Sequence, residues 1–287
     1  NAASYPVYES GFPLDFAMTK QQVQNKDWEI ASRLTGKTYL RSPTNNQQVD
    51  NNDYIMDFQN GWGEQPGEDA DYCSWMWKRH QGFDVQVYMG TGQNAERLQN
   101  MGVTPEMMWV KRRDASSDWV VYHKDMGTYP QDYYLKLNTN DAVISGNQWW
   151  KPPTSTHWFT AGGGLNNVSG AYYVAMLFSS ISGISKVGSY TGDGTNDGSH
   201  EITLGFTPRF LIIKCITSGV NFIQWNLWDS LSGLDGSGSE CYLKINQNGA
   251  EVCSYDYVDT TSTGFKLNSN YGPVNGNGNK MIYYAHA

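Results

Sequence analysis

Short apolar runs that open with a proline and close with a lysine recur along this chain. Residues 104–111 read Thr-Pro-Glu-Met-Met-Trp-Val-Lys, and residues 207–214 read Thr-Pro-Arg-Phe-Leu-Ile-Ile-Lys, 103 positions further on. An aromatic run follows each after a polar turn, at 119–122 and 222–225, and a weaker copy of the pair occupies 12–18 and 28–30. Short continuous apolar runs are typical of strands buried on both faces, so the pattern predicts a hairpin of buried strands in each copy.

The repeat divides the chain into three parts, for which we expect tandem domains at 1–81, 82–182 and 183–287. The second and third parts open with the same Val-x-x-Tyr-x-Gly strand, at 85–90 and 187–192. The first part lacks this strand, so we expect a cut upstream of Asn1. The junctions at 79–82 and 179–183 are short and polar. Such links predict a stiff array rather than domains that swing freely.

Within each part, strand signals alternate with Gly, Asn and Asp at intervals of roughly 8–15 residues. This spacing predicts an all-β fold of tandem antiparallel β-sandwich domains in three copies, of which the first is incomplete. One segment is ambiguous, because residues 93–100 favour a helix by local propensity. Their counterpart at 199–204 alternates as a strand does. We expect strands at both, since one architecture has to accommodate both copies.

Composition narrows the possible partners. The 287 residues carry a net charge of -8 with no basic cluster, which argues against a nucleic-acid partner. No apolar window is long enough for membrane insertion. The abundant Gly, Tyr and Trp indicate turns and aromatic strands rather than helices. Of the four cysteines, none forms a Cys-x-x-Cys pair, so a zinc site is not expected. We expect unpaired buried thiols; a bridge between Cys241 and Cys253 is the alternative.

The loop at 192–198, Gly-Asp-Gly-Thr-Asn-Asp-Gly, is the best sequence match to a cation-binding loop. Asp193 and Asp197 are weak calcium candidates, because the loop lacks the bidentate Glu of an EF-hand and its counterpart at 90–94 has no acid. Asp and Gly at a hairpin turn need no metal to explain them. We therefore predict no metal site. We predict no cofactor either, since the glycines do not have the spacing of a nucleotide-binding loop.

No residue set points to catalysis. There is no Gly-x-Ser-x-Gly elbow and no His-x-His or His-Glu-x-x-His pair. His123 aligns with Asn226 in the third copy, which favours a structural role for it. A carboxylate pair for glycoside hydrolysis has only loose candidates, and ordinary surface acids are the simpler interpretation; the acids are Asp229, Asp235, Glu240, Asp256 and Asp259.

Aromatic residues of the second copy are the better binding candidates. They stand where the third copy has Ser, Asn or Gly, and they are Tyr129, Trp149, Trp150, His157 and Trp158. Neighbours on a strand point to opposite faces, so one of Trp149 and Trp150 is poorly placed for the core. Exposed aromatics beside Asn and Gln suit sugar rings or a partner chain. Ordinary core packing, or a seam between domains, is the alternative.

The runs at 72–79, 82–90, 101–113 and 119–123, with 185–192 and 282–287, resemble a domain of unknown function found in bacteriophage virion and tail-fibre-like proteins, many of them marine. The likeness covers essentially the whole chain. That family often lies behind a concanavalin-like lectin domain, at the C-terminal end of longer chains. The resemblance implies a location on the virion surface and supplies no catalytic residue.

We therefore expect a non-enzymatic phage structural protein, such as a tail fibre or receptor-binding protein that contacts host glycan. Its partners would be other virion proteins and possible host surface glycan. Fibres are commonly trimeric, so a homo-oligomer is expected, although no heptad repeat indicates its order. Two alternatives stay open: a capsid-decorating or adaptor protein that binds only virion proteins, and a glycan depolymerase.

Overall fold

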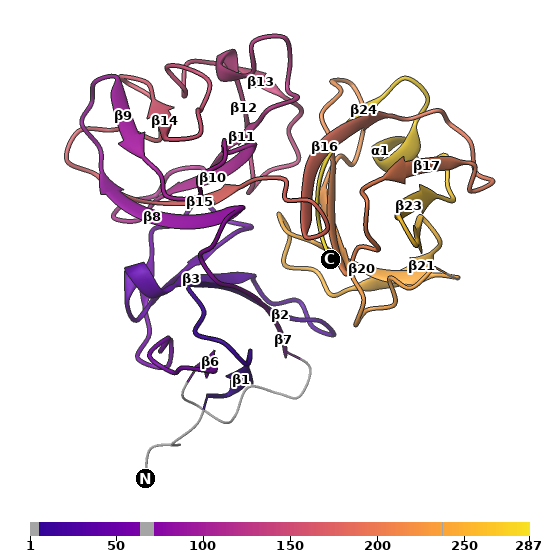
Figure 1. Ribbon diagram of the computed structural model, residues 1–287, viewed down its shortest axis with the longest axis horizontal. Helices are drawn as coiled ribbons and strands as arrows, with labels where there is room; N and C mark the ends of the chain where they lie inside the picture. Colours follow the sequence, from indigo (N-terminus) through magenta and orange to yellow (C-terminus); the bar gives the residue numbers. More distant parts are fainter. Residues whose placement is uncertain (1–5, 64–71, 237) are drawn as a thin grey trace.

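The computed structural model describes residues 6–63, 72–236 and 238–287. Its regular structure is almost entirely antiparallel β-strand, which confirms the all-β prediction. The strands gather into three lobes around a common centre, one lobe for each sequence repeat (Figure 1). We call these lobes the first, second and third repeat. In the described residues, every named strand pairs only with strands of its own repeat.

The first repeat contains six-residue strands at its centre and short strands at its margins. Its elements are β1 (Tyr8–Glu9), β2 (Phe16–Gln21), β3 (Glu29–Ser32), the 3-10 turn η1 (Arg33–Thr35), β4 (Thr38–Arg41), β5 (Val49–Asp50), β6 (Gly61–Trp62) and β7 (Tyr72–Trp77).

The second repeat contains eight strands and one 3-10 turn. Its elements are β8 (Phe83–Met89), β9 (Ala95–Leu98), β10 (Met107–Arg112), β11 (Val120–His123), the 3-10 turn η2 (Pro130–Asp132), β12 (Tyr133–Lys136), β13 (Ile144–Ser145), β14 (His157–Thr160) and β15 (Tyr172–Phe178).

The third repeat adds one strand and one helical turn. Its elements are β16 (Ser185–Thr191), β17 (His200–Thr203), β18 (Phe210–Cys215), β19 (Trp225–Asp229), β20 (Glu240–Lys244), β21 (Val252–Tyr255), β22 (Val258–Thr261), β23 (Gly264–Leu267), α1 (Gly272–Asn275) and β24 (Lys280–His286).

The main sheets of the three repeats share one strand order. It runs β13-β12-β11-β10-β15-β8 in the second repeat and β21-β20-β19-β18-β24-β16 in the third. The first has β5-β4-β3-β2-β7, the same order without a described strand beyond β7. A smaller sheet packs over each main sheet, formed by β1 and β6, by β9 and β14, and by β17, β23 and β22 respectively. The repeated sequence thus encodes a repeated sandwich.

The ambiguous segments at 93–100 and 199–204 both form strands. β9 pairs with β14 and β17 pairs with β23, so each belongs to the smaller sheet of its repeat. The side chains of β9 alternate between half-buried and exposed, as expected of a strand with one face toward solvent. Tertiary pairing therefore overrides the local helix propensity of Gln93 to Asn100.

Strand register corrects one alignment between repeats. Trp119 precedes β11 by one residue and lies eight residues after Lys111, whereas Trp225 opens β19 eleven residues after Lys214. The turn of the third repeat is thus three residues longer, and Trp225 is the counterpart of Trp119. His123 pairs with Met107 at the start of β10 in the way that Asp229 pairs with the start of β18. The counterpart of His123 is Asp229 and not Asn226.

The inner faces of the three main sheets build one shared core. Its buried members come from every repeat and include Phe16, Trp109, Val187, Phe210 and Tyr284. The ring of Trp77 in the first repeat meets Phe210 of the third edge-on at 5.3 Å, and Phe178 of the second meets Tyr284 at 5.0 Å. The outer faces of the first and third main sheets have separate apolar cores of their own. The repeats are therefore fused through a common interior.

Three tryptophans close this arrangement into a ring. The indole Nε1 of Trp28 donates to the carbonyl of Lys244 at 2.9 Å, which joins the first repeat to the third. Trp119 donates to Arg41 at 3.0 Å, joining the second to the first. Trp225 donates to Lys136 at 2.9 Å, joining the third to the second. The acceptors occupy the same place at the end of the third hairpin strand in each repeat, so the contacts follow an approximate threefold symmetry.

Backbone hydrogen bonds repeat the same cycle at the seams. The N–H of Gln48 donates to the carbonyl of Arg113 at 2.9 Å, and the N–H of Glu251 donates to Gln22 at 2.8 Å. Between the second and third repeats, the N–H of Val143 donates to Ile216 at 3.3 Å. Each donor lies directly before the outermost strand of its main sheet, which is β5, β21 or β13. Each acceptor lies two residues after the lysine that ends an apolar run. Equivalent backbone groups therefore meet at all three seams.

Those lysines, at the end of each apolar run, are buried. Lys20 Nζ donates to the carbonyl of Asn248 at 3.3 Å and Lys111 Nζ donates to that of Asn45 at 3.4 Å, so both lysines bridge repeats. Lys214 Nζ donates to the carbonyl of Ile223. Burial lowers the pKa of Lys20 and Lys111 to about 8 and that of Lys214 to about 7. Carbonyl acceptors make these ammonium groups tolerable inside the fold.

Candidate functional site

The adjacent tryptophans of the second repeat point in opposite directions. Trp149 is 1% exposed, and its ring contacts Tyr122 edge-on at 5.6 Å. Trp150 is 37% exposed. Among the residues that the structure describes, Trp150 is the one tryptophan whose side chain is exposed to solvent. One ring therefore fills the core and the other is available at the surface.

Two of the predicted surface aromatics are core residues. Trp149 lies inside the sandwich, and Trp158 on β14 is 0% exposed, with Nε1 donating to Gln86 Oε1 at 3.0 Å. The prediction that they contribute to a binding surface is wrong. The reason is packing: Trp158, on the smaller sheet, meets Tyr88 of the main sheet edge-on at 5.4 Å, and Trp149, in the loop before that sheet, packs on Tyr122 of β11.

Four residues make a group that we call the Trp150 surface: the exposed Trp150 and Lys151, the half-buried His157, and the buried Phe159. The Phe159 ring lies 6.0 Å from Trp150 and 6.4 Å from His157. Lys151 Nζ stands 3.9 Å from the centre of the Trp150 ring and 3.7 Å from Glu96 Oε1. The cation and the edge-on ring hold Trp150 in place, so its exposed part is a preordered apolar plate with charged groups beside it.

Tyr129 is 63% exposed and precedes η2. In the described part of the chain, no ring contact joins it to the Trp150 surface. The structure thus brings Trp150 and His157 together through Phe159 and leaves Tyr129 apart from them.

The third repeat has an aromatic group that was not singled out from the sequence. Tyr255 and Tyr257 are stacked at 5.2 Å and 5°, and Tyr257 stacks on Tyr271 at 5.1 Å and 11°. Tyr255 is half exposed, whereas Tyr257 is buried between its neighbours. The Tyr-x-Tyr spacing places two rings on one side of an extended chain and is the signal that could have revealed them.

Three acids lie beside this tyrosine stack. Glu240, Asp256 and Asp259 each offer a carboxylate oxygen within 4.8 Å of the others. Glu240 Oε2 accepts the N–H of Tyr257 at 3.3 Å, and Asp259 Oδ2 pairs with Lys266 Nζ at 3.2 Å. Burial, together with the other two acids, raises the pKa of Glu240 to about 7. Among the residues that the structure describes, these three carboxylates are close enough together to hold a cation or to share a proton.

The acids of the predicted calcium loop are already engaged. Asp193 Oδ1 accepts the N–H and the hydroxyl of Thr195 at 2.9 and 2.8 Å, and it accepts Asn275 Nδ2 at 3.0 Å. Asp197 Oδ1 accepts the N–H of Ser199 at 3.0 Å. Within the described residues, neither belongs to a group of acids spaced for a metal. Both carboxylates order the hairpin turn, which is the structural role that the loop sequence favours.

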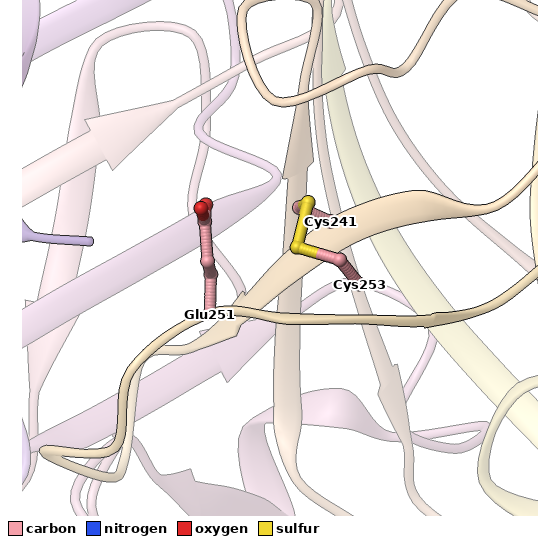
Figure 2. A group of neighbouring side chains, drawn as sticks. All are labelled: Cys241, Glu251 and Cys253. Atoms are coloured by element: carbon pink, nitrogen blue, oxygen red, sulfur yellow. A yellow bond between two sulfur atoms is a disulfide. The ribbon is translucent and has the colours of Figure 1, made fainter. Parts of the chain in front are cut away.

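Cys241 and Cys253 form a disulfide across β20 and β21, so the expectation of unpaired thiols is wrong for this pair (Figure 2). The two strands are neighbours in the main sheet, which places the sulfurs together although twelve residues separate them in sequence. Glu251 lies beside the bridge. Bonded sulfurs are not thiolate ligands, so this trio is not a metal site in the oxidised protein. Cys73 and Cys215 are free.

His123 is fully buried, and its Nδ1 accepts the N–H of Asp125 at 3.1 Å. Burial lowers the pKa of its imidazole to about 3. A neutral ring enclosed in the core cannot reach a substrate, which supports the structural interpretation of this residue. The loose acid candidates Asp229 and Asp235 are not part of the Glu240 group.

The fold and these sites define an all-β protein whose sandwiches share one core and carry aromatic groups on their outer surfaces. No described helix is both long enough and apolar enough to cross a bilayer. The chain belongs to the family described as Domain of unknown function (DUF7483), whose model matches residues 1–287. A comparison with curated proteins finds no sequence similar to it.

Proposed function

We propose that this chain is a non-enzymatic structural protein of a bacteriophage virion, exposed on the particle, and that it contacts host glycan through the Trp150 surface. The observation that carries the proposal is the preordered, exposed ring of Trp150. Sugar rings present C–H faces that stack on such a plate, while polar groups at its margin select hydroxyls. Lys151, Glu96 and His157 supply those polar groups.

Two further features support exposure outside a cell. The Cys241–Cys253 disulfide persists in oxidising surroundings and is uncommon in reducing ones. The ring of tryptophan contacts fuses the repeats into one body, which suits a protein that has to stay folded outside a cell. Neither feature requires catalysis.

The Glu240 group does not favour a depolymerase. Hydrolysis of a glycoside needs two carboxyl groups on opposite sides of a sugar in an open cleft. Glu240 and Asp259 are 1% and 5% exposed, so a sugar chain cannot enter between them. The proposal therefore keeps the protein non-enzymatic.

The test is binding to immobilised bacterial surface polysaccharides with the wild-type chain and two alanine variants. Trp150→Ala should weaken binding by about 5- to 150-fold, because stacking on one aromatic ring supplies about 1–3 kcal/mol. Tyr255→Ala, at an aromatic of the third repeat that is 50% exposed, should bind as the wild type does. Loss of binding in Tyr255→Ala alone would move the site to the tyrosine stack. Sizing the polysaccharide after incubation checks the rest, and shortened chains would refute a non-enzymatic role.

A capsid-decorating or adaptor protein is the second candidate, and one observation favours it. Met89 and Tyr172 lie directly opposite each other on β8 and β15 and are 57% and 55% exposed. An exposed apolar pair at a sheet margin suits a protein partner. Co-sedimentation of the chain with particles that lack it, compared with a Met89→Ser/Tyr172→Ser variant, tests this. Loss of attachment in the variant with unchanged glycan binding would favour the adaptor role.

A further inference from the structure

The Glu240 group, which consists of Glu240, Asp256 and Asp259, lies between the two layers of the third repeat. Glu240 opens β20 of the main sheet, and Asp259 lies on β22 of the smaller sheet. Asp256 stands in the connection between β21 and β22. One carboxylate oxygen of each acid lies within 4.8 Å of the others. A single ion bound to all three would therefore contact both layers of the sandwich.

Two of these acids are buried and have an oxygen that no protein group satisfies. Glu240 is 1% exposed and Asp259 is 5% exposed. Glu240 Oε2 accepts the N–H of Tyr257, and Asp259 Oδ2 pairs with Lys266 Nζ. Their second oxygens, Glu240 Oε1 and Asp259 Oδ1, are enclosed without a hydrogen-bond partner among the described residues. Buried carboxylates are paired or coordinate metals, so these two oxygens indicate a ligand.

Asp256 connects the buried pair to solvent. Its side chain is exposed, although one of its oxygens lies close to Glu240 and Asp259. Asn268 Nδ2 donates to Asp256 Oδ1 at 2.7 Å, which orients the carboxylate. An ion held by the three acids would thus have two buried donors on one side and an exposed donor on the other, where water can complete its coordination.

The charge and the donor atoms of the group fit a hard divalent cation. Its three carboxylates face one ammonium group, that of Lys266, so two negative charges have no ion-pair partner among the described residues. A set of oxygen donors alone favours calcium or magnesium over softer metals. Calcium fits better, because it accepts about six to eight oxygens in irregular geometry, whereas magnesium requires a near-ideal octahedron. The donors here are fixed by two different sheets and a connection, which makes an irregular arrangement the natural result.

The shared scaffold does not require these acids. The described smaller sheets of the first and second repeats have two strands each, and the third repeat adds β22. This added strand carries Asp259, and the connection that leads into it carries Asp256. Since the sandwich forms in the second repeat without β22, the acids serve a purpose beyond the fold common to the repeats.

We propose that the Glu240 group is a calcium site, in which Glu240 Oε1, Asp259 Oδ1 and the carboxylate of Asp256 bind one Ca²⁺. The ion would link β20 of the main sheet to β22 of the smaller sheet. Because it binds the folded chain, it would stabilise the third repeat by mass action. This site is distinct from the loop at 192–198, whose acids are engaged within their own turn.

Calorimetric titration of the full chain with calcium chloride, after treatment with EDTA, tests the proposal. One ion should bind per chain with a Kd on the order of 10⁻⁴ to 10⁻³ M, and saturating calcium should raise the melting temperature. Terbium replaces calcium in such sites and is excited by nearby tyrosines. It should luminesce when bound here, because Tyr257 lies beside Glu240, and calcium should displace it.

Three variants separate this site from ordinary surface acids. Asp256→Asn keeps the oxygen that accepts from Asn268 but loses one negative charge, so it should fold and bind calcium about tenfold more weakly. Lys266→Gln removes the ammonium group beside Asp259 and keeps an N–H donor, so it should bind calcium several-fold more tightly. Asp197→Asn, at an exposed acid outside the group, is the matched control and should bind as the wild type does.

Three results would overturn the proposal. The first is a lack of calcium binding by the wild-type chain up to about 10 mM, ten times the weakest expected Kd, because the acids would then share a proton instead. The second is equal affinity in the wild type and Asp256→Asn, because the ion would then bind elsewhere. The third is a loss of binding in Asp197→Asn alone, which would move the site to the loop at 192–198.

Discussion

The indole Nε1 of Trp28 donates a hydrogen bond to the carbonyl of Lys244, 216 residues away, and so joins the first repeat to the third. Equivalent bonds at the other two seams complete a closed cycle. A chain of domains joined only by short linkers would leave its ends apart. Here the last repeat contacts the first, so the stability of each repeat depends on both neighbours.

Replacing Trp28 by Phe should therefore destabilise the whole protein. The variant loses one hydrogen bond, at a cost of about 0.5–1.5 kcal/mol beyond the loss of ring volume, while the Lys244 carbonyl keeps the N–H of Gln247 as a donor at 3.1 Å. Trp109→Phe is the matched control, because Trp109 is equally buried and its Nε1 has no hydrogen-bond partner. Denaturant unfolding of both variants measures the difference. Equal losses in the two would show that the bond between repeats contributes nothing.

Lys214 should make the protein more stable as the pH rises above neutral. Its pKa of about 7 in the fold lies below the ordinary value of 10.5, so the fold disfavours the charged form. The free energy of unfolding is lowest below pH 7 and rises as the pH moves from 7 toward 10.5. At about 1.4 kcal/mol per pH unit, Lys214 contributes about 2 kcal/mol between pH 7 and 9.

Lys214→Met should flatten this rise, while Lys26→Met, at an exposed position, should not. Lys20 and Lys111 leave a residual slope above pH 8, where their own pKa values lie. Urea unfolding at pH 7, 8 and 9 provides the comparison. An unchanged slope in Lys214→Met would contradict the assignment.

His123 should make the protein less stable as the pH falls below 6.5. Its folded pKa of about 3 is below the ordinary 6.5, so protonation favours the unfolded chain. Stability is complete above pH 6.5 and falls as the pH decreases from there, by about 2 kcal/mol between pH 6.5 and 5. His123→Asn stays neutral and keeps an acceptor for the Asp125 N–H, so it should lose this dependence. His157→Gln serves as the control, and thermal melts between pH 5 and 7 would show whether the two variants differ.

Reduction of the Cys241–Cys253 bridge should destabilise the third repeat. A disulfide that closes a loop of this length contributes about 3 kcal/mol, chiefly by restricting the unfolded chain. The Cys241→Ser/Cys253→Ser variant should melt several degrees lower than the wild type and should no longer respond to dithiothreitol. Cys73→Ser, at a free thiol, should retain the response. A reductant effect that survives in the double variant would rule out this bridge as its source.

The sequence was enough to predict the all-β class, because short apolar strands and turn residues alternate along it, and strands at both ambiguous segments, because the two copies have to share one architecture. It also indicated that Trp149 and Trp150 would separate. The strand at 95–98 shows the limit of propensity alone, since the repeat and not the local sequence identified it.

Tertiary structure decided which side chains remain accessible. Trp158 is buried because its strand packs on Tyr88 of the main sheet, and Trp149 because its ring meets Tyr122, whereas Trp150 stays 37% exposed beside Phe159 and Lys151. The pairing of β20 with β21 brought Cys241 to Cys253, and a turn longer by three residues changed the counterpart of His123 to Asp229. Periodicity records which way a side chain points along its own strand. What it meets there depends on segments far away in the chain, and on loop lengths that the periodic pattern does not constrain.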